Sequence, residues 1–355
     1  DPPHTSQRND SPRHRIRHRM TDTNESTDRD DLRLARALFE AQQDDGLGLP
    51  TRPLGNTGQH VSILCLGGWH IAQCAKDDGE PEAISMMHEA IQEGMTFFDN
   101  AWDYHDGYAE EVMGRAIANR RDQVFLMTKN CERDYRGSLD NLHDSLKRLN
   151  TDHIDLWQFH ELDYDNDPEW IFEQGGLRAA LEAQKAGKIR FIGFTGHKDP
   201  RIHLDMIARP HDWDTAQMPI NICDYFFRSF QNNVVPVCLE NGIGVIGMKT
   251  LAGSPDGQNG AIPAAGLATA TQCIHYSLSQ PVSSQVLGIR IRRDLKQALD
   301  AGRNFQPLED QQLDQLREQV REMAGDGRIE LFKSTQLFDG PHHRKQHGFQ
   351  VSEND

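Results

Sequence analysis

Four side chains that could transfer protons stand at or just after the ends of short apolar runs. Asp99 lies in TFFDNA, Lys129 ends VFLMTK, His160 ends IDLWQFH, and Tyr104 follows Asp99 by five residues. A buried lysine needs a carboxylate partner, and a tyrosine beside a lysine cation ionises more easily. We therefore predict that Asp99 keeps Lys129 charged and that Lys129 lowers the pKa of Tyr104. Tyr104 would then give its proton to a carbonyl oxygen that His160 orients.

Each of these residues alone has an ordinary interpretation, such as a solvated lysine or a hydrogen-bonded histidine, so the elements that position them matter. Apolar runs alternate with amphipathic stretches across residues 60–305. In each apolar run both the odd and the even positions are apolar, as in strands that are buried on both faces. A doubly wound sheet is the alternative, but CLGGWH after the first run lacks GxGxxG. We predict one (β/α)8 barrel, with its site at the carboxyl ends of the strands. The eight runs are 61–68, 96–101, 124–129, 154–160, 189–196, 215–221, 244–249 and 284–290.

The predicted barrel domain covers residues 51–325. A β-hairpin over 51–62, with turn residues at 56–58, would plug the barrel bottom, and an extra helix at 308–323 would follow the last unit. Residues 1–45 are expected to be a disordered or loosely docked N-terminal arm, with a short helix at 32–43. Residues 326–355 carry three phenylalanines and are expected to lie across the barrel surface.

The composition excludes several function classes. The 355 residues carry 38 Lys and Arg against 54 Asp and Glu, a net charge of −16, which argues against a nucleic-acid surface. We see no apolar run long enough to span a membrane and no secretory signal. No CxxC motif occurs, so we expect buried reduced thiols in a cytoplasmic protein, without disulfides or a metal site. The six cysteines are Cys65, Cys74, Cys131, Cys223, Cys238 and Cys273.

The order of these segments resembles the aldo-keto reductase family. The resemblance covers about residues 51–305, and SLKRLNTDHIDLWQFH is its most specific part. It implies a barrel that binds NADP(H) and reduces aldehydes and ketones to alcohols, with a catalytic set at Asp99, Tyr104, Lys129 and His160. GFTGH and GMK are similar to a bacterial branch of the family, some members of which bind an iron–sulfur cluster through C-terminal cysteines that are absent here. The other segments that carry the resemblance are PLGNTGQHVSILCLGGW, FFDNAWDY, VFLMTK, GKIRFIGFTGH, TAQMPIN, NGIGVIGMKTLAGS and VLGIRIRRDLKQAL.

The resemblance also implies a cofactor site, which differs in part from the family's pattern. Gln217 matches the carboxamide-binding glutamine, whereas the usual Ser-Asn pair reads Thr195-Gly196-His197. Arginines at the start of the last helix suit a 2′-phosphate, so NADP(H) is preferred and NAD(H) stays open. The implied cofactor residues are Gly68, Trp69, Thr195, His197, Gln217, Met248, Lys249, Leu251, Gly288, Arg290, Arg293 and Gln297.

Trp69, His70 and Trp102 lie in predicted loops where the family builds its substrate pocket, and the aromatic C-terminal segment could add another wall. We expect a small carbonyl compound as substrate and no nucleic-acid or membrane partner. Two alternatives remain. The chain could be an NADP(H)-binding regulatory or sensor subunit with little turnover, or Lys129 could form a Schiff base.

Overall fold

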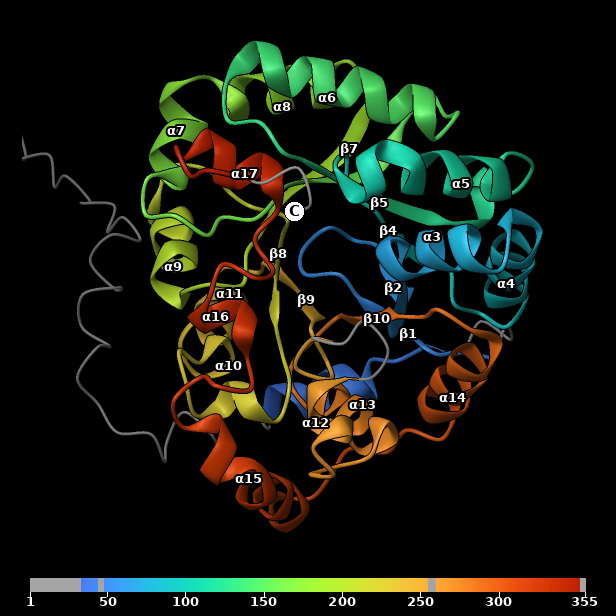
Figure 1. The fold of residues 1–355 in the computed structure, drawn as a ribbon, viewed down its shortest axis with the longest axis vertical. Helices are drawn as coiled ribbons and strands as arrows, with labels where there is room; N and C mark the ends of the chain where they lie inside the picture. Colours follow the sequence, from blue (N-terminus) through green and yellow to red (C-terminus); the bar gives the residue numbers. More distant parts are fainter. Residues whose placement is uncertain (1–32, 44–47, 255–259, 352–355) are drawn as a thin grey trace, which may run out of the picture.

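Eight parallel strands form a closed barrel in sequence order, with the last strand paired to the first. The computed structural model describes residues 33–43, 48–254 and 260–351 (Figure 1). The predicted (β/α)8 barrel is thereby confirmed. The strands are β3 (Leu64–Gly67), β4 (Phe97–Asp99), β5 (Phe125–Asn130), β6 (Ile154–Phe159), β7 (Ile189–Thr195), β8 (Thr215–Pro219), β9 (Gly244–Met248) and β10 (Ser284–Gly288).

The strands place side chains in layers inside the barrel, because every second residue of a strand points to the same face. The lower layer is an apolar cluster that includes Cys65, Phe97, Met127, Leu156 and Ile246. Two residues further along the same strands stand Gly67, Asp99, Lys129, Gln158 and Met248. A polar layer therefore lies directly above the apolar one, toward the carboxyl ends of the strands.

The outer ring consists of helices between the strands. Two predicted helices are each divided: residues 232–242 near Pro236, and residues 262–280 at Gly266, where φ is +68°. The helices are α3 (Gly68–Asp77), α4 (Glu80–Gln92), α5 (Tyr108–Ile117), α6 (Tyr135–Arg148), α7 (Asp167–Glu173), α8 (Gly176–Lys185), α9 (Pro200–Ala208), α10 (Phe230–Asn233), α11 (Val235–Glu240), α12 (Ala261–Ala264), α13 (Ala270–Leu278), α14 (Arg292–Arg303), α15 (Asp310–Ala324), α16 (Leu331–Ser334) and α17 (Pro341–Gln346), with 3-10 turns η1 (Tyr104–Gly107), η2 (Arg121–Gln123) and η3 (Cys223–Tyr225).

The predicted hairpin closes the amino end of the barrel. Strands β1 (Thr51–Pro53) and β2 (His60–Ser62) pair antiparallel. Leu54 joins the lower apolar cluster, and a Cβ on Gly55 would lie 2.3 Å from the Gly244 backbone nitrogen, so only glycine fits this approach. Arg52 is fully buried and donates to the Leu278 and Val282 carbonyl oxygens.

The C-terminal segment, residues 326–351, runs from α15 past α16 to α17 and lies over the carboxyl end of the barrel (Figure 1). Buried Lys333 anchors it by donating to Asp224 at 2.6 Å and to Glu330 at 2.8 Å. At the other end of the chain, residues 33–40 are helical, and Phe39 packs on Phe305 with ring centroids 5.9 Å apart. Residues 1–32 of the predicted arm lie outside the described residues.

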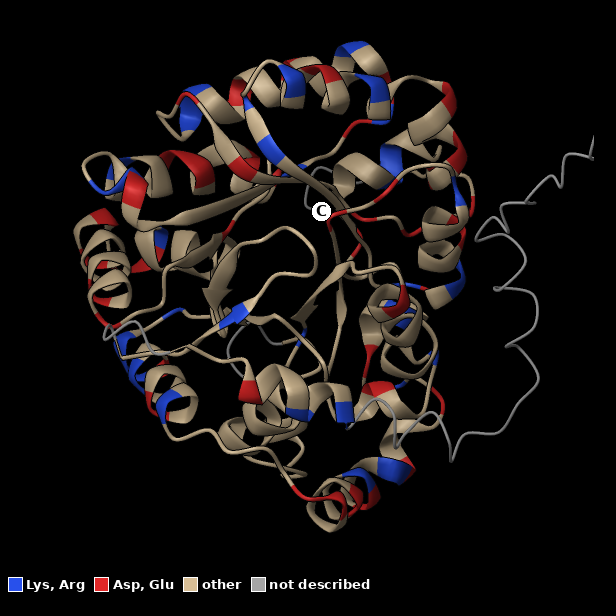
Figure 2. Ribbon diagram, turned by 180° about the vertical axis from the view of Figure 1, so that it is seen from behind, with Lys and Arg blue, Asp and Glu red and all other residues tan. Residues whose placement is uncertain are grey.

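Charged residues of both signs are interspersed over the ring of helices, whereas the central strands carry few (Figure 2). Within the described ranges, no helix is long and apolar enough to cross a membrane. All six cysteines are buried, as expected, and none forms a disulfide in this structure.

Candidate active site

The Lys129 amine joins three partners at the carboxyl end of β5. The side chain is 1% exposed and forms an ion pair with Asp99, the last residue of the neighbouring strand β4. The same amine donates to the Asn100 carbonyl oxygen at 2.7 Å and to the Tyr104 hydroxyl oxygen at 3.3 Å. The sequence-predicted contacts between Asp99, Lys129 and Tyr104 are therefore present. Because the Lys129 amine is ion-paired rather than free, the arrangement disfavours the Schiff-base alternative.

A strained turn holds Tyr104 over the barrel. Tyr104 begins η1, and the next two residues, His105 and Asp106, have φ values of 51° and 57° in the left-handed region. Gly107 follows at φ 89°, where a Cβ would lie 2.3 Å from the Arg148 guanidinium. Arg148 donates to the Trp102 carbonyl oxygen at 2.8 Å, which ties the turn to α6. The hydroxyl of Tyr104 is therefore held in place by backbone shape as well as by Lys129.

Burial raises the pKa of Tyr104 well above its usual range, and the charges of Asp99, Asp103 and Glu161 raise it further. The predicted lowering of this pKa is wrong, because burial and these negative charges raise it. Tyr104 is therefore protonated at neutral pH and has a proton to give.

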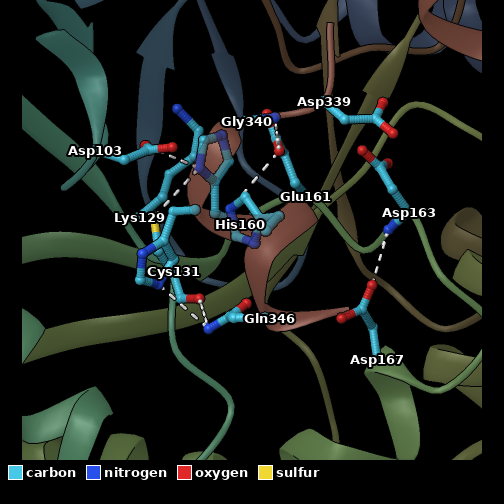
Figure 3. A network of polar contacts seen from close by, with 12 residues as sticks. Asp103, Lys129, Cys131, His160, Glu161, Asp163, Asp167, Asp339, Gly340 and Gln346 are labelled. Atoms are coloured by element: carbon cyan, nitrogen blue, oxygen red, sulfur yellow. Dashed lines mark hydrogen bonds and ion pairs between the residues drawn. The ribbon is translucent and has the colours of Figure 1, made fainter. Parts of the chain in front are cut away.

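His160 follows β6 and is 4% exposed. Its ring meets the Tyr104 ring edge-on, with centroids 5.5 Å apart. On its other side, His160 Nδ1 lies 3.2 Å from Asp103 Oδ1 and 3.6 Å from Cys131 Sγ (Figure 3). The His343 ring of α17 packs against it at 5.3 Å. Sequence reasoning brought His160 to the site but missed these three neighbours.

Asp103 and Cys131 could have been found, since each follows a strand end by only a few residues. His343 is 183 positions beyond His160 in the chain, and only the fold of the C-terminal segment brings it here.

Two further carboxylates, Asp163 and Glu161, surround His197. His197 Nε2 is 3.2 Å from Asp163 Oδ2 and 4.0 Å from Glu161 Oε1. Burial lowers the pKa of His197, but Asp163 and Glu161 outweigh this and raise it overall. His197 Nδ1 lies 3.1 Å from the Phe332 carbonyl oxygen. His197, a predicted cofactor ligand, is thus held by Asp163, Glu161 and the C-terminal segment.

Four predicted cofactor residues stand on β7 to β10: Thr195, Met248 and Gly288 are the last residues of β7, β9 and β10, and Gln217 is the middle residue of β8. Gln217 Oε1 accepts from Gln158 at 2.7 Å, and its Nε2 faces the Met248 sulfur at 3.7 Å. Gly68 directly follows β3 and begins α3. A Cβ at this position would lie 2.7 Å from the Asp99 carbonyl oxygen.

Lys249 has a φ of 56°, and its amine lies over the rings of Phe338 at 5.0 Å and Phe332 at 5.8 Å. Among the described residues, no ion pair within 4.0 Å is seen for this lysine. Burial lowers its pKa. Leu251 lies two residues on and packs in an apolar cluster with the neighbouring helices.

The predicted phosphate-binding residues surround the start of α14. Arg290 forms an ion pair with Asp77 at 2.5 Å, whereas the Arg293 side chain is 79% exposed. Arg293 and Gln297 line a shallow cavity of about 450 Å³ between α13 and α14, together with Thr271, His275, Lys296, Asp300, Ala301 and Asn304.

The three predicted pocket residues do not lie together. Trp69 is 47% exposed, and its ring meets the Tyr104 ring at 5.5 Å. Trp69 and His70 lie on helix α3, so the prediction of a loop there is wrong. His70 turns toward β10, since a Cβ on Gly288 would lie 2.5 Å from its Nδ1. Trp102 donates to Asp144 at 3.1 Å and packs against His342 of α17.

The sequence model of the Aldo/keto reductase family matches residues 63–260. This chain belongs to the aldo/keto reductase family. Members of the family are oxidoreductases, and two curated relatives come from Bacillus subtilis. The uncharacterized oxidoreductase YrpG is 32% identical over 233 residues, covering 56% of this chain and 66% of that protein. The aldo-keto reductase YhdN is 31% identical over 204 residues, covering 54% and 58%. The matches thus span less than two thirds of either relative.

Solved structures of aldo/keto reductases share the fold. The holo form of AKR11C1 from Bacillus halodurans has a TM-score of 0.64 at 23% identity, covering 76% of this chain and 96% of that one. An enzyme from Klebsiella pneumoniae in complex with NADP and acetate has a TM-score of 0.62 at 22% identity, covering 77% and 94%. At these identities the similarity shows only that the fold is shared.

Proposed function

We propose that this aldo/keto reductase reduces an aldehyde or ketone to an alcohol with NADPH, using Tyr104 as the general acid. The observation that carries the proposal is the Lys129 amine, which joins the Asp99 carboxylate to the Tyr104 hydroxyl at the barrel mouth. Lys129 donates to the tyrosine oxygen, which leaves the tyrosine proton free to point at a substrate.

The chain's own residues would do the following. Tyr104 gives its proton to the substrate oxygen, and the resulting phenolate is stabilised by the hydrogen bond from Lys129. His160, whose ring stands against the Tyr104 ring, donates to the same oxygen as negative charge develops on it. Asp99 keeps the lysine positioned and charged throughout.

The residues present fit a nicotinamide dinucleotide phosphate. The amine of half-buried Lys249 lies over two aromatic rings, and no ion pair within 4.0 Å is seen for it in the described ranges, so a pyrophosphate could pair with it. The amide of Gln217 has a weak sulfur partner and could bind the carboxamide. Arg293 and Gln297 line a cavity open to a 2′-phosphate, which favours NADPH over NADH. Bound NADPH would supply the hydride for the carbonyl carbon.

The substrate would lie between Trp69 and the C-terminal segment. Trp69 offers an apolar face next to Tyr104, and Phe338 and His343 approach from the other side of the mouth. This lining favours an aromatic or apolar carbonyl compound. The six free thiols further support a reducing compartment such as the cytoplasm.

The test is a panel of aldehydes and ketones, with NADPH and NADH oxidation followed by absorbance. Tyr104→Phe should lower kcat/KM by about 10²–10⁴-fold, because it removes the general acid. Tyr108→Phe is the matched control, since Tyr108 bonds to Glu80 on the outer helices and should keep its activity. Unchanged turnover in Tyr104→Phe would rule out the proposed acid.

One observation favours the sensor-subunit alternative: the His343 ring packs edge-on against the His160 ring, with centroids 5.3 Å apart, so the C-terminal segment lies against a proposed catalytic residue. Quenching of tryptophan fluorescence by NADPH, with no oxidation across the whole panel, would support it. Turnover of any carbonyl that depends on Tyr104 would reject it.

A further inference from the structure

Four potential metal ligands converge beside the proposed acid. Asp103, Cys131, His160 and His343 each offer one ligand atom, and these atoms all lie within 4.8 Å of one another. Cys131 and His343 are fully buried, and His160 is nearly so. They come from the turns after β4 and β5, the end of β6, and α17, so three barrel strands and the C-terminal segment meet at this point (Figure 3).

The spacing of these atoms is that of a tetrahedral zinc site. Zinc bonds of about 2.0 Å to N or O and about 2.3 Å to S put neighbouring ligand atoms about 3.3 Å apart for N and O, and about 3.6 Å apart for N and S. His160 Nδ1 lies 3.2 Å from Asp103 Oδ1 and 3.6 Å from Cys131 Sγ. No two of the four ligand atoms lie more than 4.8 Å apart, so no pair needs to close by more than about 1.5 Å.

Unsatisfied polar atoms mark the same place. Within the described part of the chain, Asp103 Oδ1 and both ring nitrogens of His343 are buried and make no hydrogen bond. Although Asp103 Oδ1 lies close to His160 Nδ1, the pair lacks hydrogen-bond geometry. Buried polar atoms without partners are rare, because each one loses its hydration on folding. A bound cation would satisfy Asp103 Oδ1 and one of the two ring nitrogens of His343.

We propose that Asp103, Cys131, His160 and His343 bind one divalent metal ion, with Zn²⁺ as the ion that the donor set fits best. One thiolate, two imidazoles and one carboxylate are the ligand types that zinc takes in proteins, and thiolate disfavours Mg²⁺ and Ca²⁺. The two anionic ligands also balance the charge of the ion in this buried place.

Surrounding groups hold the ligands in position, as outer partners do in metal sites. The Cys131 backbone N–H donates to Asn141 at 3.0 Å, and the Cys131 carbonyl oxygen accepts from Gln346 at 3.0 Å. Glu161 Oε2 lies 3.7 Å from His343 Nε2 and accepts from the Gly340 N–H at 2.8 Å. The C-terminal segment is thus fixed on both sides of His343.

An ion at this position would serve two purposes. It would bind the C-terminal segment to the barrel through His343. It would also occupy His160 Nδ1 and leave Nε2–H as the only donor of that ring, which is the tautomer that can orient a carbonyl oxygen. This second purpose rests on the proposed function, whereas ion binding itself does not.

The proposal departs from the sequence analysis, which expected no metal site. No two of the four ligands stand at a spacing typical of a zinc motif, because the set is assembled from four separate segments.

The experiment measures metal content of the full chain without reference to turnover. Purified protein is stripped with a chelator, reloaded with Zn²⁺, separated by gel filtration and analysed by mass spectrometry for zinc. We expect one zinc per chain. Loading with Co²⁺ should give a thiolate-to-cobalt charge-transfer band and the visible bands of a tetrahedral ion. Circular dichroism of each sample checks that the chain is folded.

Cys131→Ser should remove the charge-transfer band, and His343→Ala should weaken zinc binding by more than about 100-fold, beyond the effect of outer partners. The matched controls are Cys238→Ser, a buried cysteine far along the chain in α11, and His342→Ala, one residue before His343. Both should keep one zinc. A folded wild-type chain that binds no stoichiometric zinc overturns the proposal. Equal zinc content in wild type, Cys131→Ser and His343→Ala does so as well, since it indicates adventitious binding.

Discussion

The two ends of the barrel interior differ sharply although the same strands build both. At the amino end, Phe97 and Met127 pack with Leu54 of the hairpin in a wholly apolar layer. Two residues further on, Asp99 and Lys129 form a buried ion pair. Burying charge is unfavourable unless it is paired, so the polar layer is retained where a site needs it and the apolar layer supplies stability. The contrast separates the layer that holds the fold from the layer that carries the proposed chemistry.

The largest effect should follow from removing the amine that organises the polar layer. Lys129→Met leaves Asp99 buried without a partner and Tyr104 without its hydrogen bond. We expect kcat/KM to fall by about 10²–10⁴-fold and the free energy of unfolding to fall by about 3–5 kcal/mol. Kinetics and urea unfolding measure the two. Lys185→Met, on the exposed face of α8, is the control. Full activity in Lys129→Met would contradict the role given to this layer.

A substitution in the apolar layer should affect stability alone. Phe97→Ala opens a cavity beneath the site and should lower the free energy of unfolding by about 3–5 kcal/mol. The folded fraction should keep its kcat/KM within about twofold, because Phe97 touches no proposed catalytic atom. Leu181→Ala, at an exposed position, should change stability by less than about 0.5 kcal/mol. A large loss of kcat in folded Phe97→Ala would remove the distinction between the layers.

A buried histidine outside both layers, on α9, should also carry pH dependence. Burial lowers the pKa of His203, whose Nε2–H donates to the Gln217 carbonyl oxygen at 3.1 Å, from 6.5 to about 4. Between these pH values the unfolded chain holds the proton and the folded chain does not. Stability therefore rises with pH across this window and is lost as pH falls, by up to about 3 kcal/mol.

His203→Gln keeps a donor for that carbonyl and cannot titrate in this range. Urea unfolding between pH 4 and 6.5 should show a shallower slope in this variant, by about 1.4 kcal/mol per pH unit. An unchanged slope would assign the pH dependence to other groups, such as His70.

The smallest effect concerns the rim outside both layers. Arg293→Ala should raise KM for NADPH by about tenfold and leave KM for NADH unchanged, because an exposed arginine would contact only the 2′-phosphate. Arg136→Ala, also highly exposed but on α6, should alter neither. Equal increases for both cofactors in Arg293→Ala would indicate a contact with the shared part of the dinucleotide.

The sequence predicted the barrel and three site residues for one physical reason. Strands buried on both faces are apolar throughout, and parallel strands bring their carboxyl ends together, so Asp99, Lys129 and His160 had to meet. Helix α3 was missed because it begins directly at Gly68 without a polar cap, and its short amphipathic stretch reads as a loop.

The sequence alone could not predict the pKa of Tyr104 or the contact between His343 and His160. The pKa of Tyr104 depends on burial and on the charges of Asp99, Asp103 and Glu161, not on the neighbouring lysine alone. His343 reaches His160 because several contacts hold the C-terminal segment on the barrel, among them Lys333 to Asp224 and the Gly340 N–H to Glu161. Neither the pKa nor this contact produces a recognisable motif in the amino-acid sequence.

The position of the C-terminal segment has a consequence for how the molecule is made. Synthesis runs from the amino terminus, so all eight strands leave the ribosome before His343 does. The apolar layer and its hairpin plug can therefore form while the mouth is still open to water. The buried polar atoms around His160 lose their hydration only when the last turn of chain docks. Assembly of the barrel and completion of its mouth are separate events in time.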